Sequence, residues 1–239
     1  MSVKLGITGT RPCGYLKDQE ERLIVTVADE ETPMNAHLYE HLMAHGFRRS
    51  HNDVYRPHCE SCQACESLRI PVSDFSFSKN QKRVLHKNRD LVLSVVEKPQ
   101  PDYTSLFCRF IEERHADGAM YPPDPESFWL WCDADWMKPQ FFEWRDSAGE
   151  LMMVSIVDVL SCSSSAMYTF FDPDEAKRSL GTYSILSLIE WTEAQGLDYL
   201  YLGYQIDNCD KMNYKARFTP NERLIGNQWK KAVKSNTQK

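Results

Sequence analysis

Three cysteines, Cys59, Cys62 and Cys65, stand at two-residue spacing in the first half of the chain. Thiolates at this spacing can turn toward one ion, and a fourth ligand would complete a tetrahedral zinc site or an iron–sulfur site. Because no second pair of cysteines occurs at a conventional spacing, the fourth ligand would be Cys13 or His58, brought in by folding. The alternative is a cysteine-rich turn that binds nothing, and the spacing does not decide between the two.

A second segment that could do chemistry, residues 178–183, reads Arg-Ser-Leu-Gly-Thr-Tyr and lies where a predicted strand is followed by a predicted helix. A helix start presents unpaired N–H groups, and Lys177 and Arg178 add two full charges, so the segment suits a phosphate or an acyl oxygen. Acetyltransferases have a similar loop with a small residue at the last position, where this chain has Tyr183. We therefore expect a donor other than coenzyme A. The alternative is an ordinary capped helix with basic flanks.

Charge is distributed unevenly along the chain. The formal net charge is −6, but residues 211–239 carry eight Lys and Arg against Glu222 alone, a local charge of +7 beside a body of −13. Tyr214, Phe218 and Trp229 alternate with these charges, a mixture typical of surfaces that stack bases and neutralise phosphates. The negative total excludes indiscriminate nucleic-acid binding, so an RNA partner must meet a local patch. The alternative is a set of solvated surface lysines.

The spacing of apolar residues predicts an α+β chain. Apolar residues recur at helical spacing from Tyr103 to Ile111, and Gly118 ends this helix. Three antiparallel strands, a helix and a further strand are then expected at residues 140–145, 151–160, 166–171, 180–195 and 199–206. A strand–helix–strand crossover attached to an antiparallel meander is the order of elements in the acetyltransferase-like (GNAT-type) acyl-transfer fold.

A proline-rich break at residues 99–101 separates two portions of the chain. Before it, Asn35 opens a helical pattern that Gly46 closes, and the cysteines follow. We expect a smaller N-terminal cysteine-bearing α/β portion over residues 1–98 and the GNAT-like acyl-transfer portion over residues 99–239.

Composition excludes several classes of protein. Hydrophobic residues make up 42% of the chain and charged residues 26%, which excludes disorder as the main state. No apolar stretch has the length of a membrane span, and the first residues lack the apolar segment of a secretory signal. We expect a cytoplasmic protein with reduced thiols and no membrane partner. No Walker loop, GxSxG or GxGxxG motif occurs, so a covalent serine enzyme has no support.

Motifs spread from about Pro12 to Arg223 resemble those of the bacterial aspartate/glutamate leucyltransferases. In the first half they are Pro12-Cys13-Gly14-Tyr15-Leu16, Gly46-Phe47-Arg48-Arg49-Ser50, Tyr55-Arg56-Pro57-His58-Cys59 and Ser67-Leu68-Arg69-Ile70-Pro71-Val72. In the second half they are Phe170-Phe171-Asp172-Pro173, Ser179-Leu180-Gly181-Thr182-Tyr183-Ser184-Ile185-Leu186, Tyr201-Leu202-Gly203-Tyr204 and Lys211-Met212-Asn213-Tyr214-Lys215-Ala216. The chain departs from the family at Gln205, where an aromatic residue is more frequent.

The resemblance implies an aminoacyl-tRNA-protein transferase, related to the arginyl enzymes. Such an enzyme moves leucine from leucyl-tRNA, its co-substrate, to the N-terminal α-amine of proteins that begin with Asp or Glu, and the product enters the N-degron pathway of protein degradation. The transfer itself requires no cofactor. An arginyl-tRNA-dependent transferase of the same family stays open, because a side-chain pocket that the sequence does not delineate selects the donor.

Roles within this resemblance follow from side-chain chemistry. The proton of the attacking amine could pass to Tyr168 or Tyr204, with the ribose 2′-OH as an alternative. Arg69 and Arg83 are the candidates for the acidic acceptor, since a guanidinium matches carboxylate geometry. The expected contacts to the aminoacylated 3′ end of tRNA are Arg178, Gly181, Lys211 and Lys215.

Two rival interpretations come from the same features. The crossover order would also fit a coenzyme A-dependent N-acetyltransferase, against which Tyr183 argues. The cysteines would also fit a metal- or redox-sensing nucleic-acid-binding module built on Cys13, Cys59, Cys62 and Cys65. A sensor would bind RNA or DNA without consuming an aminoacyl ester.

Overall fold

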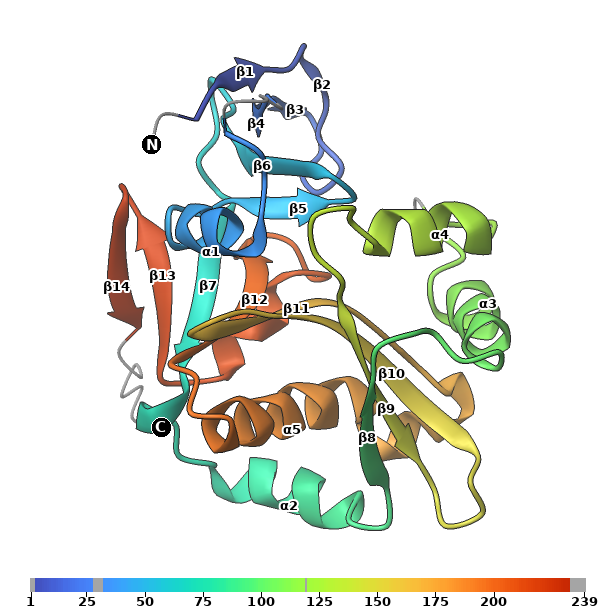
Figure 1. The fold of residues 1–239 in the computed structure, drawn as a ribbon. Coiled ribbons are helices and arrows are strands. Elements are labelled where there is room, and N and C mark those ends of the chain that lie inside the picture. The colour runs from blue at the N-terminus through green and yellow to red at the C-terminus, as the bar shows by residue number, and fades with distance from the viewer. Residues whose placement is uncertain (1–2, 28–31, 119, 233–239) are drawn as a thin grey trace.

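A mixed central sheet organises the protein. The computed structural model describes residues 3–27, 32–118 and 120–232. Within these residues the central sheet has eight strands, in the spatial order β14 (Gln228–Ala232), β13 (Asn221–Ile225), β7 (Glu66–Pro71), β12 (Tyr199–Gln205), β11 (Ser163–Phe171), β10 (Leu151–Val159), β9 (Gln140–Arg145) and β8 (Val92–Val96). Helices pack on it (Figure 1), so the predicted α+β class is confirmed.

A separate small sheet forms at the N-terminal end. Its four strands, described in spatial order, are β1 (Leu5–Ile7), β4 (Leu23–Thr26), β6 (Asp53–Pro57) and β5 (Arg48–Ser50). A short ladder, β2 (Arg11–Pro12) with β3 (Glu20–Glu21), lies beside it. The predicted helix before Gly46 is α1 (Ala36–Ala44), whose first turn is capped by Asn35. Its apolar face packs on Val54 and Tyr201, and thereby joins the small sheet to the central one.

The predicted meander and crossover are both present. β9, β10 and β11 pair antiparallel in sequence order, and helix α5 (Leu180–Ala194) returns the chain to β12, which pairs parallel to β11. β9 has the predicted bounds, whereas β11 begins at Ser163, before the expected strand start at residue 166. Ser164 and Ser165 are buried there, and Ser164 bonds the Thr192 hydroxyl of α5 at 2.7 Å. A hydroxyl that finds a buried partner can enter a strand, so the serine run did not mark the strand end.

β11 and β12 separate after a short paired stretch. Their register runs from Ser163 with Tyr199 to Ser165 with Tyr201, while β11 continues along β10 and β12 continues along β7. At the separation β12 carries a bulge, and Gly203 follows it with φ of +78°. A residue with a Cβ rarely adopts this conformation, so glycine lets β12 turn away from its neighbour here.

The two faces of the central sheet carry different helices. α5 and the basic helix α2 (Lys79–Lys87) cover one face, over a core that includes Leu68, Phe142 and Leu200. α3 (Tyr103–Arg114) and α4 (Pro125–Cys132) cover the other, around Val154 and Phe170. Figure 1 shows α2 at the end of the molecule away from the N-terminal sheet. Short 3₁₀ turns, η1 (Val72–Asp74), η2 (Pro173–Arg178) and η3 (Asn213–Arg217), complete the described elements.

The division between the sheets differs from the predicted boundary at residues 98/99. Although β7 and β8 belong to the first 98 residues, β7 pairs with β12 and β8 pairs with β9. Strand edges of the meander and crossover were free to pair, and the earlier chain supplies the partners. The small sheet therefore ends at Pro57, and the cysteine-bearing residues 58–65 connect it to the central sheet.

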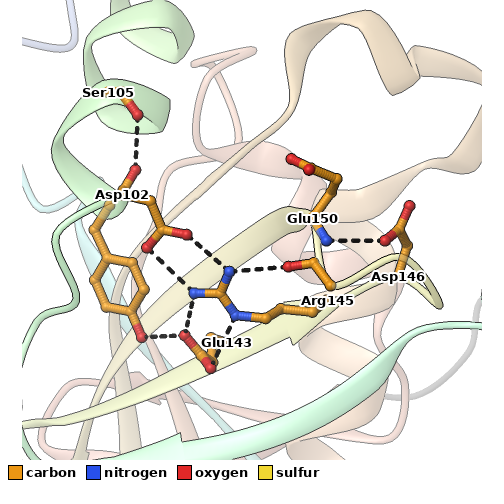
Figure 2. Close-up of polar contacts among 8 residues, drawn as sticks. Asp102, Ser105, Glu143, Arg145, Asp146 and Glu150 are labelled. Atoms are coloured by element: carbon orange, nitrogen blue, oxygen red, sulfur yellow. Dashed lines mark hydrogen bonds and ion pairs between the residues drawn. The ribbon is translucent and has the colours of Figure 1, made fainter.

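A polar network fixes the start of α3 against the central sheet (Figure 2). The guanidinium of Arg145 on β9 bonds both carboxylate oxygens of Asp102, at 2.7 and 3.2 Å, and both of Glu143, at 3.0 and 3.1 Å. The hydroxyl of Tyr103 donates to Glu143 at 2.7 Å. Because Glu143 is buried, these donors offset the loss of its hydration.

Candidate active site at the junction of the two sheets

A cleft of about 1240 Å³ lies between the N-terminal sheet and one end of the central sheet. The small sheet, the cysteine-bearing residues and the turn between β13 and β14 line it, together with Ser67, Tyr204 and Ile206 of the central region. The charged side chains of its lining are mostly acidic: Glu20, Glu21, Asp53, Glu60 and Glu66, against Arg11 and Arg56.

The four predicted metal ligands, Cys13, Cys59, Cys62 and Cys65, all line this cleft. Each is a free thiol. Burial, followed by the proximity of the other three cysteines, raises the pKa of the Cys65 thiol to about 12. In the described part of the chain no group of three or more His, Cys, Asp or Glu side chains is spaced to hold a metal ion. Folding brings Cys13 to the same cleft as the other cysteines, and metal binding there stays a prediction.

Two adjacent arginines of β5 are buried beside the cleft but have different partners. Arg49 forms a bidentate pair with Asp158 at 2.7 and 2.9 Å, with both side chains fully buried. Arg48 donates instead to the carbonyl of Phe47 at 2.8 Å and to the hydroxyl of Ser67 at 2.7 Å. Among the residues that the structure describes, its Nε has no hydrogen-bond partner. Arg49 is therefore neutralised by a carboxylate, while Arg48 has no carboxylate partner in the described part of the chain and lies over the rings of Tyr201 and Tyr204.

Lys215, expected to contact the 3′ end of tRNA, is buried next to the same junction. Its Nζ donates to the carbonyl of Tyr204 at 2.6 Å and lies 3.7 Å from the sulfur of Met212. Burial, followed by repulsion from Arg48, lowers the pKa of Lys215 to about 8. The ammonium therefore contacts the last part of β12, where this strand has already separated from β11. It does not lie on an open surface along which an RNA backbone could bind.

The two predicted catalytic tyrosines occupy different environments. Tyr204 is buried at the cleft, and its hydroxyl donates to the carbonyl of Gly46 at 2.8 Å. Burial raises its pKa well above the ordinary value. Tyr168 lies on β11 against the rings of Phe128 and Trp131, and burial raises its pKa to about 12. Both phenols stay neutral at pH 7, so they can donate a hydrogen bond but are weak proton acceptors.

The predicted phosphate-binding segment lies at the start of α5. Arg178 is held by the side chains of Asn88 and Asp90. Gly181 packs against the ring of Phe171: a Cβ added at this position would lie only 3.3 Å from the ring. Tyr183 is buried in the core beside Trp144, with ring centroids 6.3 Å apart. The tyrosine therefore points into the core and does not occlude the loop, so its identity no longer argues against coenzyme A.

Comparison with known proteins identifies the family. Residues 11–83 match the family described as "Arginine-tRNA-protein transferase, N terminus", and residues 102–225 match "Arginine-tRNA-protein transferase, C terminus". The chain belongs to the arginine-tRNA-protein transferase family. The family predicted from the short motifs is thereby confirmed, as is the prediction of an aminoacyltransferase.

Its curated relatives match over almost their whole length. The protein named aspartate/glutamate leucyltransferase from Pseudoalteromonas atlantica is 47% identical over 95% of this chain and 96% of its own. The protein of the same name from Aeromonas hydrophila is 46% identical over 95% of this chain and 94% of its own. Among solved structures, FemX aligns with 89% of this chain and 82% of its own at 7% identity, with a TM-score of 0.49, which is too remote to carry over a site.

The basic C-terminal segment, residues 211–239, contributes buried side chains to the core as well as exposed charges. Lys211 is exposed and pairs with Asp117 at 2.9 Å. Of the three aromatic residues expected to stack bases, Phe218 is buried in the core and Trp229 donates from its indole N–H to the carbonyl of Ala44. Only Tyr214 is exposed. The segment forms β13 and β14, which the charge pattern did not reveal, and residues 233–239 of the predicted basic tail lie outside the described residues.

The two arginines expected to bind the acidic acceptor do not converge. Arg69 lies between the rings of Tyr199 and Trp229, 3.7 and 4.1 Å from their centroids, and its Nε donates to Glu222. Arg83 lies on α2, away from the cleft, where it donates to Asn80 at 3.2 Å. Their role in this transferase stays a prediction, and Arg69 already has a carboxylate partner.

The cation that the sequence interpretation passed over is Arg48. It stands in the motif Gly46-Phe47-Arg48-Arg49-Ser50, which was used only for the family resemblance. Arg48 and Arg49 are consecutive residues of β5, so their side chains point to opposite faces of the strand and meet different surroundings. The pair of consecutive arginines was the feature of the sequence that could have pointed to Arg48.

Among the residues described, none of the helices has both the length and the apolar character needed to span a bilayer.

Proposed function

We propose that this chain transfers leucine from leucyl-tRNA to the N-terminal α-amine of proteins that begin with Asp or Glu, as a step of the N-degron pathway in the cytoplasm. The observation that carries the proposal is the 47% identity, over 95% of the chain, to a protein named aspartate/glutamate leucyltransferase. The relative is covered over 96% of its length, so both portions of the family are represented.

The reaction is an ester aminolysis. The acceptor nitrogen attacks the leucyl carbonyl carbon, the bond from that carbon to the ribose oxygen breaks, and the proton lost by nitrogen ends on the departing ribose oxygen. The ester is already activated, so alignment of amine and ester supplies most of the acceleration, about 7–11 kcal/mol in well-oriented reactions. A strand–helix–strand crossover whose strands separate, as β11 and β12 do, supports an acetyltransferase-like acyl-transfer core.

Neutral tyrosines suit the electrophilic side of this reaction. With its pKa raised to about 12, Tyr168 would donate a hydrogen bond to the leucyl carbonyl oxygen rather than remove a proton. Tyr204 would hold the cleft wall through its bond to Gly46. The ribose 2′-OH is then the proton relay closest to the reacting bond, and it belongs to the substrate.

Leucyl-tRNA is the co-substrate, and its 3′ end would meet Gly181 at the start of α5 and the basic residues Arg178 and Lys211. The N–H groups of the first turn of α5 and the exposed ammonium of Lys211 are suited to phosphate oxygens. The transfer itself needs no metal or organic cofactor.

The four cysteines of the cleft would have to move closer together to hold zinc or an iron–sulfur cluster, since no group of three such side chains in the described residues is spaced to hold a metal ion. Four thiolates are a donor set that both zinc and an iron–sulfur cluster accept, and the placement of all four cysteines on one cleft supports the proposal. Metal analysis and the absorption spectrum of the purified protein test it. Neither metal nor chromophore in protein purified without oxygen would contradict it.

A transfer assay tests the proposed function directly. Labelled leucyl-tRNA should give labelled peptide when the acceptor begins with Asp or Glu, and little when it begins with Asn or Gln. No transfer by correctly folded protein would overturn the proposal. Because the family descriptions name an arginine-tRNA-protein transferase, arginyl-tRNA is compared in parallel. Preferential transfer of arginine would establish the alternative donor.

A further inference from the structure

Arg48 and Lys215 are two buried cations without a counter-charge. Their exposed fractions are 7% and 8%. Arg48 donates to the carbonyl of Phe47 and the hydroxyl of Ser67 and lies over the rings of Tyr201 and Tyr204, 5.0 and 5.8 Å from their centroids. Lys215 donates to the carbonyl of Tyr204 and the sulfur of Met212. Across the described residues no carboxylate lies at ion-pair distance from either side chain. A buried charge is costly unless it is paired, so the absence of a partner requires an explanation.

The two cations share one neighbour and act on each other. The guanidinium carbon of Arg48 lies 5.8 Å from the ring centroid of Tyr204, whose carbonyl accepts from Lys215. Repulsion from Arg48 contributes to the lowered pKa of Lys215. An anion received between them would relieve this repulsion and neutralise both charges.

The pair borders the cleft. Ser67 and Tyr204, which contact the two cations directly, are both part of its lining. Among the described residues the Nε of Arg48 is buried without an acceptor, so its N–H is available to an incoming group. The neighbouring Arg49 offers no such opportunity, because Asp158 already satisfies it.

We infer that Arg48 and Lys215 form the site that receives the side-chain carboxylate of the acceptor's N-terminal Asp or Glu. The inference rests on the proposed function and deepens it, since it assigns the residues that select an acidic acceptor. The assignment replaces Arg69 and Arg83, of which the first is already neutralised by Glu222 and the second lies on α2.

The charges of the cleft favour a peptide N-terminus over an RNA phosphate. Acidic residues outnumber basic ones in its lining. Glu21, Glu60 and Glu66 are paired with arginines, while Glu20 and Asp53 would repel a polyanionic backbone and attract an α-ammonium group. An N-terminal Asp or Glu carries an ammonium and a carboxylate a few bonds apart. An acidic lining beside a buried basic pair matches both charges of that residue.

Two substitutions test the site. Arg48→Gln and Lys215→Met remove the charge and retain much of the side-chain length. Both should raise KM for a peptide that begins with Asp by at least about tenfold, because a charged hydrogen-bonded contact is lost. The kcat at saturating peptide should change little, and the preference for Asp over an otherwise identical Asn peptide should collapse. An unchanged KM and preference in folded variants would overturn the assignment.

Matched measurements separate this role from others. Lys138→Met removes an exposed lysine that pairs with Asp133, and it should leave KM for the Asp peptide unchanged. Binding of leucyl-tRNA, measured by filter retention, should stay within about twofold in Arg48→Gln and Lys215→Met, since an acceptor site contributes nothing to tRNA affinity. A loss of tRNA affinity as large as the change in peptide KM would instead assign the pair to RNA.

A probe that needs no variant guards against loss of folding. A peptide with an N-terminal succinyl group carries the carboxylate but no amine, and the matching succinamoyl peptide carries a neutral amide. The succinyl peptide should raise the melting temperature of the wild type more than the amide does. Equal effects of the two probes would contradict the site.

The two levels of proposal can fail separately. If the wild type transfers leucine to the Asp peptide while both variants keep the wild-type KM, the site is wrong and the function stands. If the wild type transfers leucine to no peptide but binds the succinyl probe selectively, the function is wrong and the anion site stands.

Discussion

Arg49 and Asp158, 109 positions apart in the chain, form a bidentate ion pair from which solvent is fully excluded. The pair joins β5 of the N-terminal sheet to β10 of the central sheet. Arg49 also donates to the carbonyls of Cys132 and Asp133 at the end of α4. Its hydrogen bonds therefore connect β5, β10 and the end of α4. The pair therefore fixes one sheet against the other directly beside the cleft.

Arg49→Met should destabilise the protein by about 3–5 kcal/mol, because it leaves the Asp158 carboxylate buried and unpaired. Denaturant unfolding followed by circular dichroism would measure the change. In the double variant with Asp158→Asn, the loss should be smaller than the sum of the two single losses. Simple additivity of the two losses would contradict a direct coupling.

Arg145→Gln should lower stability by about 2 kcal/mol, because Asp102 and the buried Glu143 lose charged hydrogen bonds (Figure 2). Arg145 holds the pKa of Asp102 below its ordinary value of 3.8. That contribution is present above the unfolded-state pKa and is lost as the pH falls through the folded-state value. The difference in melting temperature between wild type and variant should therefore shrink in acid. A difference independent of pH would assign the effect to packing.

Gly46→Ala should be more destabilising than Gly149→Ala. Both glycines have positive φ, +88° and +86°, so both substitutions strain the backbone. At Gly46 the added Cβ would also stand 2.8 Å from the side chain of Leu224, whereas nothing lies within 4 Å of it at Gly149. Unfolding free energies should differ by about 1 kcal/mol or more, since the close contact is added to the strain. Equal losses would show that Leu224 moves aside without cost.

Binding of the succinyl peptide should weaken as the pH rises through about 8, the pKa to which burial and Arg48 bring Lys215. The protonated lysine attracts the carboxylate, and the neutral amine does not. Lys215→Arg stays charged over this range, so its binding should not weaken in the same way. Arg48 and the thiols of Cys209 and Cys65, which also act on Lys215, are present in both proteins. If the binding of the succinyl peptide had the same pH profile in the wild type and in Lys215→Arg, Lys215 would be excluded from the site.

Local patterns were sufficient for the second half of the fold. The apolar spacing of α3 and α5 and the turn residues between β9 and β10 mark elements whose bounds differ little from those expected. Each helix buries one face, so its periodicity is visible in the chain, whereas β9 and β10 are buried on both faces and read as apolar runs. β13 and β14 were missed because their strands are mixed in character and their charges suggested a solvated tail.

The chemical nature of the site was only partly visible in the sequence. The cysteines were identified as a group, and folding does place Cys13 at the same cleft as the other three. The side-chain type of Arg69 suits a carboxylate ligand, but the carboxylate that it binds is Glu222, which lies 153 positions later in the chain. Which arginine keeps a free charge depends on partners that are remote in the chain.

Residue type and spacing alone determined the family, the kind of reaction and the sequence order of the acyl-transfer elements, because these properties reside in contiguous motifs and local periodicity. Tertiary structure decided which charges remain uncompensated. Arg48 and Arg49 are neighbours with identical side chains, yet only Arg49 meets a carboxylate, since alternate residues of β5 face different surroundings. The candidate acceptor site is the position at which long-range folding left two buried cations without a carboxylate partner among the described residues.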